Sequence, residues 1–239
     1  MKKAGLFLAA IMNMTMVTSA DAILIDRGNG MIYDDVLDIT WLQDANFART
    51  SGYDDDGRMT WDAATNWAGN LVFGGYEDWR LPSFTDIGSP GCNHGVDCGW
   101  NVDTASSELA YMYYVNLGLQ SPINEDGSFD PTHGIFGNGT RNGTDASSYG
   151  QNDLGLIKNI QAYGYWSGTE LSHNSSYAWD FGTVNGAQGY TVKTAQYYAW
   201  AVRPGDTDIV AVPEPGTLLL LVAGLMGIAG ARRGGLLVK

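Results

Sequence analysis

An acidic run stands directly before a glycine in the first third of the chain: Asp54, Asp55, Asp56 and Gly57. Oxygen ligands clustered at a glycine turn suit Ca²⁺. The pattern is partial, because a full EF-hand loop would carry an acid in place of Gly52 and a glutamate in place of Ala63. A second partial cluster consists of Asn124, Asp126, Gly127 and Asp130. Calcium is therefore the one cofactor that the sequence suggests, with solvated acidic turns as the alternative at both places.

The two cysteines, Cys92 and Cys98, lie six positions apart. In an oxidising compartment this spacing favours a disulfide that closes a small loop. The alternative is a metal site that also uses His94 and Asp97, but no second ligand pair with zinc-like spacing occurs elsewhere in the chain. We expect the disulfide.

Trp79 and Arg80, followed by Leu81 and Pro82, could form a ligand platform. Aromatic faces stack on sugars, and an arginine donates a planar fork of hydrogen bonds. The alternative is a role in the fold, in which Arg80 is buried and paired with a carboxylate such as Asp78 or Asp38. Three other tryptophans, Trp166, Trp179 and Trp200, lie on alternating segments and are expected in the core.

Catalytic motifs are scarce. The chain has neither the Gly-x-Ser-x-Gly motif of serine hydrolases nor the His-Glu-x-x-His motif of zinc proteases, and its three histidines lie in loop-like surroundings. Acidic residues are so numerous that a pair at glycosidase spacing carries no information. We therefore expect a binding or structural module and not an enzyme.

The N-terminal 22 residues have the order of a secretory signal peptide. Lys2 and Lys3 form the basic start, an apolar run follows, and small residues surround Ala20 and Ala22. Cleavage by signal peptidase is expected after Ala22, with the bond after Ala20 as the second choice.

The C-terminal segment, residues 212–239, contains a rigid motif, Pro213, Glu214 and Pro215, then an apolar stretch, then Arg232 and Arg233. This order resembles the bacterial PEP-CTERM sorting signal. The resemblance implies that an exosortase recognises the motif after export, and that the protein reaches the cell surface or extracellular space. The apolar stretch would hold the chain in the membrane at least transiently, with the arginines on the cytoplasmic side; a permanent anchor is the alternative.

Charge is distributed unevenly along the chain. The full sequence has a formal charge of −13, but five of its 13 basic residues and only two of its 26 acidic residues lie in the two end segments. Residues 23–211 therefore carry −16 and should not bind nucleic-acid phosphates. This length and an apolar content of 44% for the whole chain predict one globular domain.

Two helices are expected to position these residues. The first is capped by Thr60, places Trp61, Ala64, Ala68 and Leu71 on one face, and ends at Gly74 and Gly75. The second begins at Ser106 or Ser107, buries a stripe and ends near Gly118. That stripe consists of Leu109, Met112, Tyr113 and Leu117.

Short alternating segments predict strands around these helices. They occur within residues 23–46, 163–169, 177–181, 189–193 and 197–202. Asn185 and Gly186 indicate a hairpin turn in a loop longer than two residues. Residues 120–153, rich in Gly, Asn and Ser, predict a long surface excursion. The fold class is α+β: two helices, a mainly antiparallel sheet and long loops.

Several blocks resemble the Lcl C-terminal domain family. They are residues 26–33, 38–42, 165–169 and 199–203, and most specifically the Gly-Gly-x-x-Asp-Trp-Arg-Leu-Pro block at 74–82. The resemblance implies a C-type-lectin-like fold over residues 23–211. The family's named member is a collagen-like adhesin whose C-terminal domain binds sulfated glycans. This chain lacks the collagen stalk, and a domain of −16 would repel a polyanion, so that ligand is not carried over.

These observations predict an exported, exosortase-sorted surface or extracellular-matrix protein whose domain binds a neutral or calcium-bridged polysaccharide. Two alternatives stay open. One is a structural matrix or biofilm component without a discrete ligand site. The other is a carbohydrate-active hydrolase, which would need a pocket containing a carboxylate of strongly raised pKa.

Overall fold

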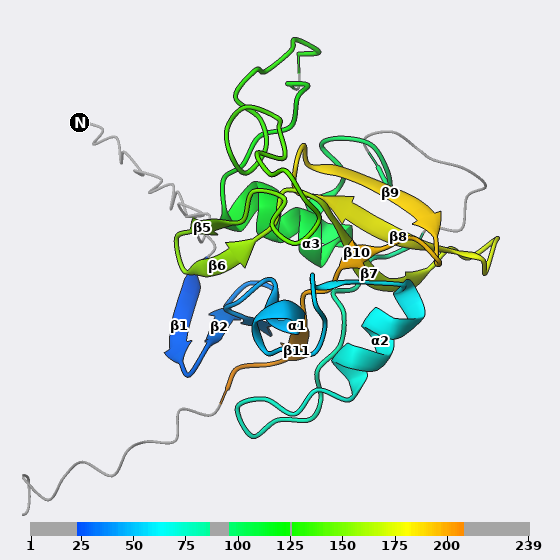
Figure 1. Ribbon diagram of the computed structural model, residues 1–239. Coiled ribbons are helices and arrows are strands. Elements are labelled where there is room, and N and C mark those ends of the chain that lie inside the picture. Colours follow the sequence, from blue (N-terminus) through cyan, green and yellow to red (C-terminus); the bar gives the residue numbers. More distant parts are fainter. Residues whose placement is uncertain (1–22, 87–95, 125, 208–239) are drawn as a thin grey trace, which may run out of the picture.

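The computed structural model describes residues 23–86, 96–124 and 126–207 (Figure 1). Its helical segments are α1 (Phe47–Thr50), α2 (Trp61–Gly69), the 3-10 turn η1 (Thr104–Ser106), α3 (Glu108–Tyr111) and the π-turn η2 (Met112–Asn116). Its first six strands are β1 (Leu24–Gly28), β2 (Met31–Asp34), β3 (Ile39–Leu42), β4 (Arg58–Met59), β5 (Asn152–Leu154) and β6 (Ile157–Ile160). The remaining five are β7 (Gly164–Glu170), β8 (Tyr177–Gly182), β9 (Ala187–Val192), β10 (Tyr197–Tyr198) and β11 (Val202–Pro204).

The strands form two main sheets and one small hairpin. One sheet has the order β1-β2-β3-β11, the other β4-β10-β7-β8-β9, and β5 pairs with β6. All described strand pairs are antiparallel except β10 with β7, which run parallel. The α+β prediction with a mainly antiparallel sheet is confirmed at this level. The chain passes from β10 of the larger sheet to β11, the edge strand of the smaller one, through the three residues 199–201.

Both predicted helices form, with one boundary moved. Thr60 caps α2 by accepting a hydrogen bond from the Ala63 amide, as expected. The helix ends at Gly69, before Gly74, because the Asn70 side chain donates a hydrogen bond of 2.7 Å to the Asn66 carbonyl and closes the last turn. A short helix, α1, was not predicted.

The second helix begins where the sequence indicates. Ser107 caps α3, and the chain continues through the π-turn η2 to Asn116. Leu109, Met112 and Tyr113 are buried, and Gly118 follows with a φ of +60°. The predicted stripe therefore packs into the core. Residues 120–151 form the expected excursion without helix or strand among those described, whereas the β5–β6 hairpin after it was missed.

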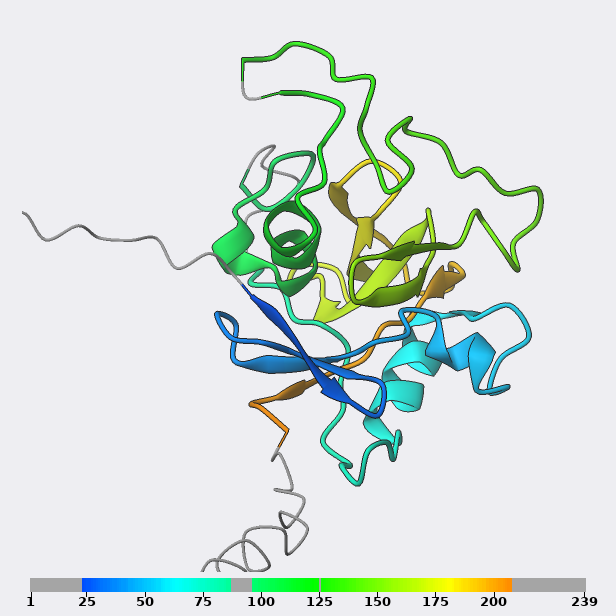
Figure 2. The same ribbon diagram turned by 90° about the vertical axis from the view of Figure 1, so that its left-hand side faces the viewer.

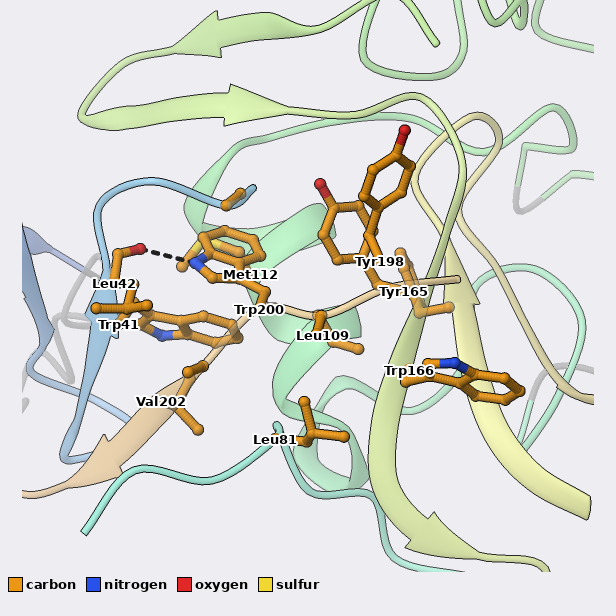
Figure 3. Close-up of a cluster of buried hydrophobic side chains, with 14 of the residues drawn as sticks. Trp41, Leu42, Leu81, Leu109, Met112, Tyr165, Trp166, Tyr198, Trp200 and Val202 are labelled. Carbon is orange, nitrogen blue, oxygen red and sulfur yellow. Dashed lines mark hydrogen bonds between the residues drawn. The ribbon is translucent and has the colours of Figure 1, made fainter. Parts of the chain in front are cut away.

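The core lies between the two sheets and α3 (Figure 3). Trp41, Trp166 and Trp200 belong to this core, whereas Trp179 lies in a second buried cluster with Phe84, Cys98 and Leu171. All four tryptophans are at most 1% exposed, which confirms that Trp166, Trp179 and Trp200 are buried. The Trp200 indole N–H donates a hydrogen bond of 2.7 Å to the Leu42 carbonyl, drawn as the dashed line in Figure 3. Aromatic side chains therefore fill the space between the two sheets.

The excursion and the C-terminal end lie on opposite sides of this core. In Figure 1 and in the turned view of Figure 2, the green segment after α3 rises above the larger sheet. The last described residues, in orange, leave beside the blue β1–β3 sheet below. The larger sheet and the excursion therefore form one end of the described domain, and its last described residues lie at the other.

Candidate functional site

A hollow on one face of the larger sheet is built from residues without side chains or with very small ones. Asp180 lies in the middle of β8, directly opposite Gly189 of β9. Gly182, two positions on, pairs with Gly164 of β7 and with Ala187 of β9. Directly opposite residues of antiparallel strands project on the same face. Three glycines and one alanine therefore border the carboxylate on this face, and the buried Trp166 of β7 lies directly opposite it.

The opposite face of β8 is occupied by the core. Phe181, the neighbour of Asp180, packs its ring 5.3 Å from that of Tyr113 beside α3. Successive strand residues point to opposite faces, so Asp180 points away from the helix. The result is a pocket of about 210 Å³ whose walls include Arg141, Tyr163, Val184 and Tyr197.

Asp180 is held in an unfavourable environment for a charge. Its Oδ2 atom is buried and has no hydrogen-bond partner among the residues that the structure describes. Burial raises the pKa of the Asp180 carboxyl to about 6, and a hydrogen bond from Thr191 opposes this only in part. A carboxylate that keeps an unmatched oxygen next to a pocket is a candidate ligand-binding group.

Tyr197 forms one wall of the pocket. Its ring lies against Gly164, where a Cβ atom would come within 3.0 Å of the ring carbons. Burial, followed by the charge of Asp180, raises the pKa of the Tyr197 hydroxyl, so the group stays protonated at neutral pH. The hydroxyl lies 3.4 Å from Thr191 Oγ1. Tyr197 thus gives the pocket an aromatic face and a hydroxyl.

The excursion contributes Arg141 to the rim. Its guanidinium lies 4.3 Å from the Tyr163 ring centroid and 5.3 Å from that of Tyr149. The two rings are themselves stacked, with centroids 4.5 Å apart and an interplanar angle of 10°. No salt bridge of Arg141 occurs within the described residues. These contacts hold the loop over the sheet. Arg141 is exposed, so its guanidinium N–H groups stay available to a ligand.

The predicted platform residues Trp79 and Arg80 line a hollow of about 230 Å³, so ligand binding there stays a prediction, and both also have contacts within the fold. Trp79 is 2% exposed, and its indole N–H donates to the Phe73 carbonyl at 3.2 Å. Arg80 binds Glu108 through two hydrogen bonds of 2.7 Å, one from each terminal nitrogen. The ion pair corresponds to the alternative, a role in the fold, but the Arg80 side chain is 37% exposed and not buried as that alternative expected. The partner named for Arg80 was wrong: Asp78 instead binds Arg203, and Asp38 accepts from Tyr33.

Replacing Glu108 with glutamine should destabilise the protein by about 1–2 kcal/mol, because hydrogen bonds to a charged group contribute about 1.5–3 kcal/mol and Arg80 is partly solvated. Glu108 also accepts from the Ser83 amide at 2.6 Å, so three donors are affected. The measurement is the urea midpoint of E108Q against that of E77Q, a control at an exposed carboxylate. Equal midpoints for the two variants would contradict this role.

The acidic runs considered for calcium act as turns. Asp54 accepts from the amides of Asp56 and Gly57, at 3.0 Å and 2.7 Å. Asp56 binds Arg58. In the second cluster, Asp126 and Asp130 accept from residues two positions on. Among the described residues, no group of three or more His, Cys, Asp or Glu side chains is arranged to hold a metal ion. Asp55 adds no third ligand, and calcium stays a prediction.

Other predicted sites fall partly or wholly outside the described residues. Cys98 is buried and disulfide-bonded, while Cys92 lies in the segment that is not described. Three further predicted features also lie outside the described residues: the signal peptide, the sorting motif Pro213–Pro215 and the arginines at 232 and 233. Within the described ranges, no helix has the length and apolar character needed to cross a bilayer.

The pocket itself was not predicted, although one signal points to it. Asp180 interrupts the aromatic and apolar run of β8, Tyr177-Ala178-Trp179-Asp180-Phe181. A carboxylate in such a strand needs either a partner or a reason to stay without one. Arg141 and Tyr163 are 39 and 17 positions away in the sequence, so their proximity follows only from the tertiary fold.

Two family models match the chain. The Lcl C-terminal domain model matches residues 30–203, and the PEP-CTERM protein-sorting motif matches residues 211–233. No curated protein and no solved structure matches it, so the C-type-lectin-like part of the fold prediction stays a prediction. The sorting motif marks a protein that is exported and processed by an exosortase. The first match spans most of the chain, including every residue of the pocket, and the chain therefore belongs to the Lcl C-terminal domain family.

Proposed function

We propose that this exported protein works at the cell surface or in the extracellular matrix, where its domain binds a polysaccharide in the pocket beside Asp180. The observation that carries the proposal is the pocket itself. It combines the rings of Tyr163 and Tyr197 with a carboxylate acceptor and an arginine donor. Apolar and aromatic walls with a few convergent polar groups are typical of small-ligand sites.

The position of the pocket suits a protein sorted through its C-terminus. The pocket lies on the larger sheet under the excursion, whereas the last described residues, in orange, lie on the side of the β1–β3 sheet (Figure 1). A domain held at its C-terminal end would therefore present the pocket away from that end. This arrangement supports binding of an extracellular ligand.

The enzyme alternative gains one observation and lacks another. A carboxylate of raised pKa in a pocket is a feature of acid catalysts, and Asp180 has it. Most glycosidases, however, use two carboxylates that flank the bond. Asp180 is the one carboxylate that lines this pocket in the described structure. Binding without cleavage is the function that these residues support better.

The test is binding of the full-length exported protein to an array of bacterial and plant polysaccharides, with calcium and with a chelator. Saturable binding in both conditions is the expected result. Binding only with calcium would assign the metal a role. A blank array would instead support the structural alternative, a matrix component without a ligand site. Release of soluble sugars during incubation would identify an enzyme.

Sorting can be tested separately from binding. Replacing Pro213, Glu214 and Pro215 with alanine should leave uncleaved protein in the membrane fraction, since the exosortase would lose its recognition motif. Immunoblots of membrane and culture fractions measure this outcome. A scrambled segment downstream of Gly234 serves as the control. Normal release of the alanine variant would refute exosortase processing at this motif.

A further inference from the structure

We infer that the pocket on β7–β9 takes a single uncharged sugar residue of a glycan, with the Asp180 carboxylate accepting hydrogen bonds from its hydroxyls and Arg141 donating to its oxygens. This inference rests on the proposed polysaccharide binding and specifies its ligand. It differs from the sulfated ligand that the family resemblance implies.

The charges at the pocket balance each other. Asp180 supplies one negative group and Arg141 one positive group, and Tyr163 and Tyr197 contribute aromatic rings. The Tyr197 hydroxyl responds to both charges, because Asp180 raises its pKa and Arg141 lowers it. A ligand of either charge would therefore meet one favourable and one unfavourable group. An uncharged polyol meets a strong acceptor and a strong donor at once.

The surrounding domain opposes an anionic ligand further. Residues 23–211 carry a formal charge of −16, so a uronic-acid or sulfated polymer would be repelled at long range. A polycation would be attracted by this field, and it is the competitor that the test has to separate. Within the pocket, Arg141 on the rim disfavours a cationic residue.

The size of the pocket also limits the ligand. Sites for drug-sized molecules usually span about 300–1,000 Å³, and this one spans about 210 Å³. Gly164, Gly182 and Gly189 provide the floor, and each added Cβ atom would reduce the space on this face. One sugar residue fits such a volume better than a longer segment of a chain.

The Asp180 carboxylate supplies the energetic reason for recognition. Its Oδ2 atom has no partner among the described residues but is closed off from solvent, so a ligand hydroxyl gains it as an acceptor only if the Asp180 side chain turns toward the pocket. Hydrogen bonds to charged groups contribute more than neutral ones. A ligand that lacks a hydroxyl at this place would leave the carboxylate unmatched and would be rejected.

The test compares full-length wild-type protein with D180N, R141Q and E77Q. Glu77 is exposed and lies outside the pocket, and E77Q makes the same carboxylate-to-amide change as D180N at that surface. The probes are dextran, mannan and galactan as neutral polymers, chitosan as the cationic one and alginate as the anionic one. We expect wild-type and E77Q to prefer a neutral polymer. D180N should bind it at least about tenfold more weakly, and R141Q should also be weaker.

The outcomes separate the two proposals. If wild-type protein binds none of the polymers, polysaccharide binding itself fails and the inference fails with it. If wild-type protein binds but D180N binds equally well, or if chitosan or alginate is preferred, only the inference is overturned. A melting temperature for D180N no lower than that of wild type at pH 7.5 shows that lost binding is not caused by unfolding.

Discussion

Replacing Trp200 with alanine is expected to destabilise the protein by about 3–5 kcal/mol, the usual cost of removing a buried aromatic side chain. The free energy of unfolding of a folded domain is about 5–15 kcal/mol in total, so this substitution would remove a large share of it. The effect is large because Trp200 lies where the two sheets meet. Its ring centroid is 4.6 Å from Trp41 of β3 and 6.1 Å from Tyr165 of β7.

The Trp200 substitution removes a hydrogen bond as well as volume. The indole N–H donates to the Leu42 carbonyl, and alanine cannot replace it (Figure 3). W200F keeps most of the ring and loses the donor, so it should cost less, about 1–2 kcal/mol. Comparing the two variants separates the contribution of packing from that of the hydrogen bond.

Trp100 provides a matched control for this experiment. It is the same residue type but 39% exposed, so W100A should change the free energy of unfolding by less than about 1 kcal/mol. Urea unfolding followed by far-ultraviolet circular dichroism measures all three variants. Similar midpoints for W100A and W200A would show that Trp200 does not join the sheets in the way described.

Local patterns in the sequence predicted the helices well because their determinants are local. Thr60 and Ser107 cap the helices that follow them, and the apolar spacing from Leu109 to Tyr113 marks the buried face. The boundary of α2 was wrong because the Asn70 side chain, and not a glycine pair, closes the helix. A competing polar side chain of this kind has little effect on apolar periodicity.

Long-range partners were not predictable in the same way. Arg80 could be expected to bind a carboxylate, but Glu108, 28 positions away, could not be chosen over the nearer Asp78. The parallel pairing of β10 with β7 and the contact of Arg141 with Tyr163 likewise depend on how distant segments meet. The pocket could therefore not be predicted from the sequence. The sequence contains every residue that lines it, but it does not show that Asp180 lies beside small residues of neighbouring strands.

The second large effect concerns Asp180 and pH. Its folded-state pKa of about 6 lies above the ordinary value of 3.8, so the folded protein binds a proton in a range where the unfolded chain has lost it. Stability from this group is therefore greatest at low pH and falls as pH rises through about 4–6. The difference between pH 4 and pH 8 should be about 2 kcal/mol. Arg141, Tyr163 and Tyr197 share the pocket with this carboxyl.

D180N isolates this contribution because asparagine carries no charge at any pH. Relative to wild type, the variant should gain about 2 kcal/mol of stability between pH 4 and pH 8, measured as the change in the free energy of unfolding from urea titrations. E77Q should show a small difference from wild type at both pH values, as expected for an exposed position. A D180N difference that does not change with pH would mean that the carboxyl is not destabilised by burial.

A pH-dependent gain would also bear on function. An aspartate that costs stability at neutral pH, next to a hollow lined by glycines, is expected where a ligand supplies the missing partner. D180N should then be more stable and bind sugar more weakly, two changes of opposite sign from one substitution. A sugar that binds wild type should in turn raise the wild-type melting temperature at pH 8, and it should have little effect on that of D180N. Equal ligand-induced shifts in the two proteins would place the binding site elsewhere.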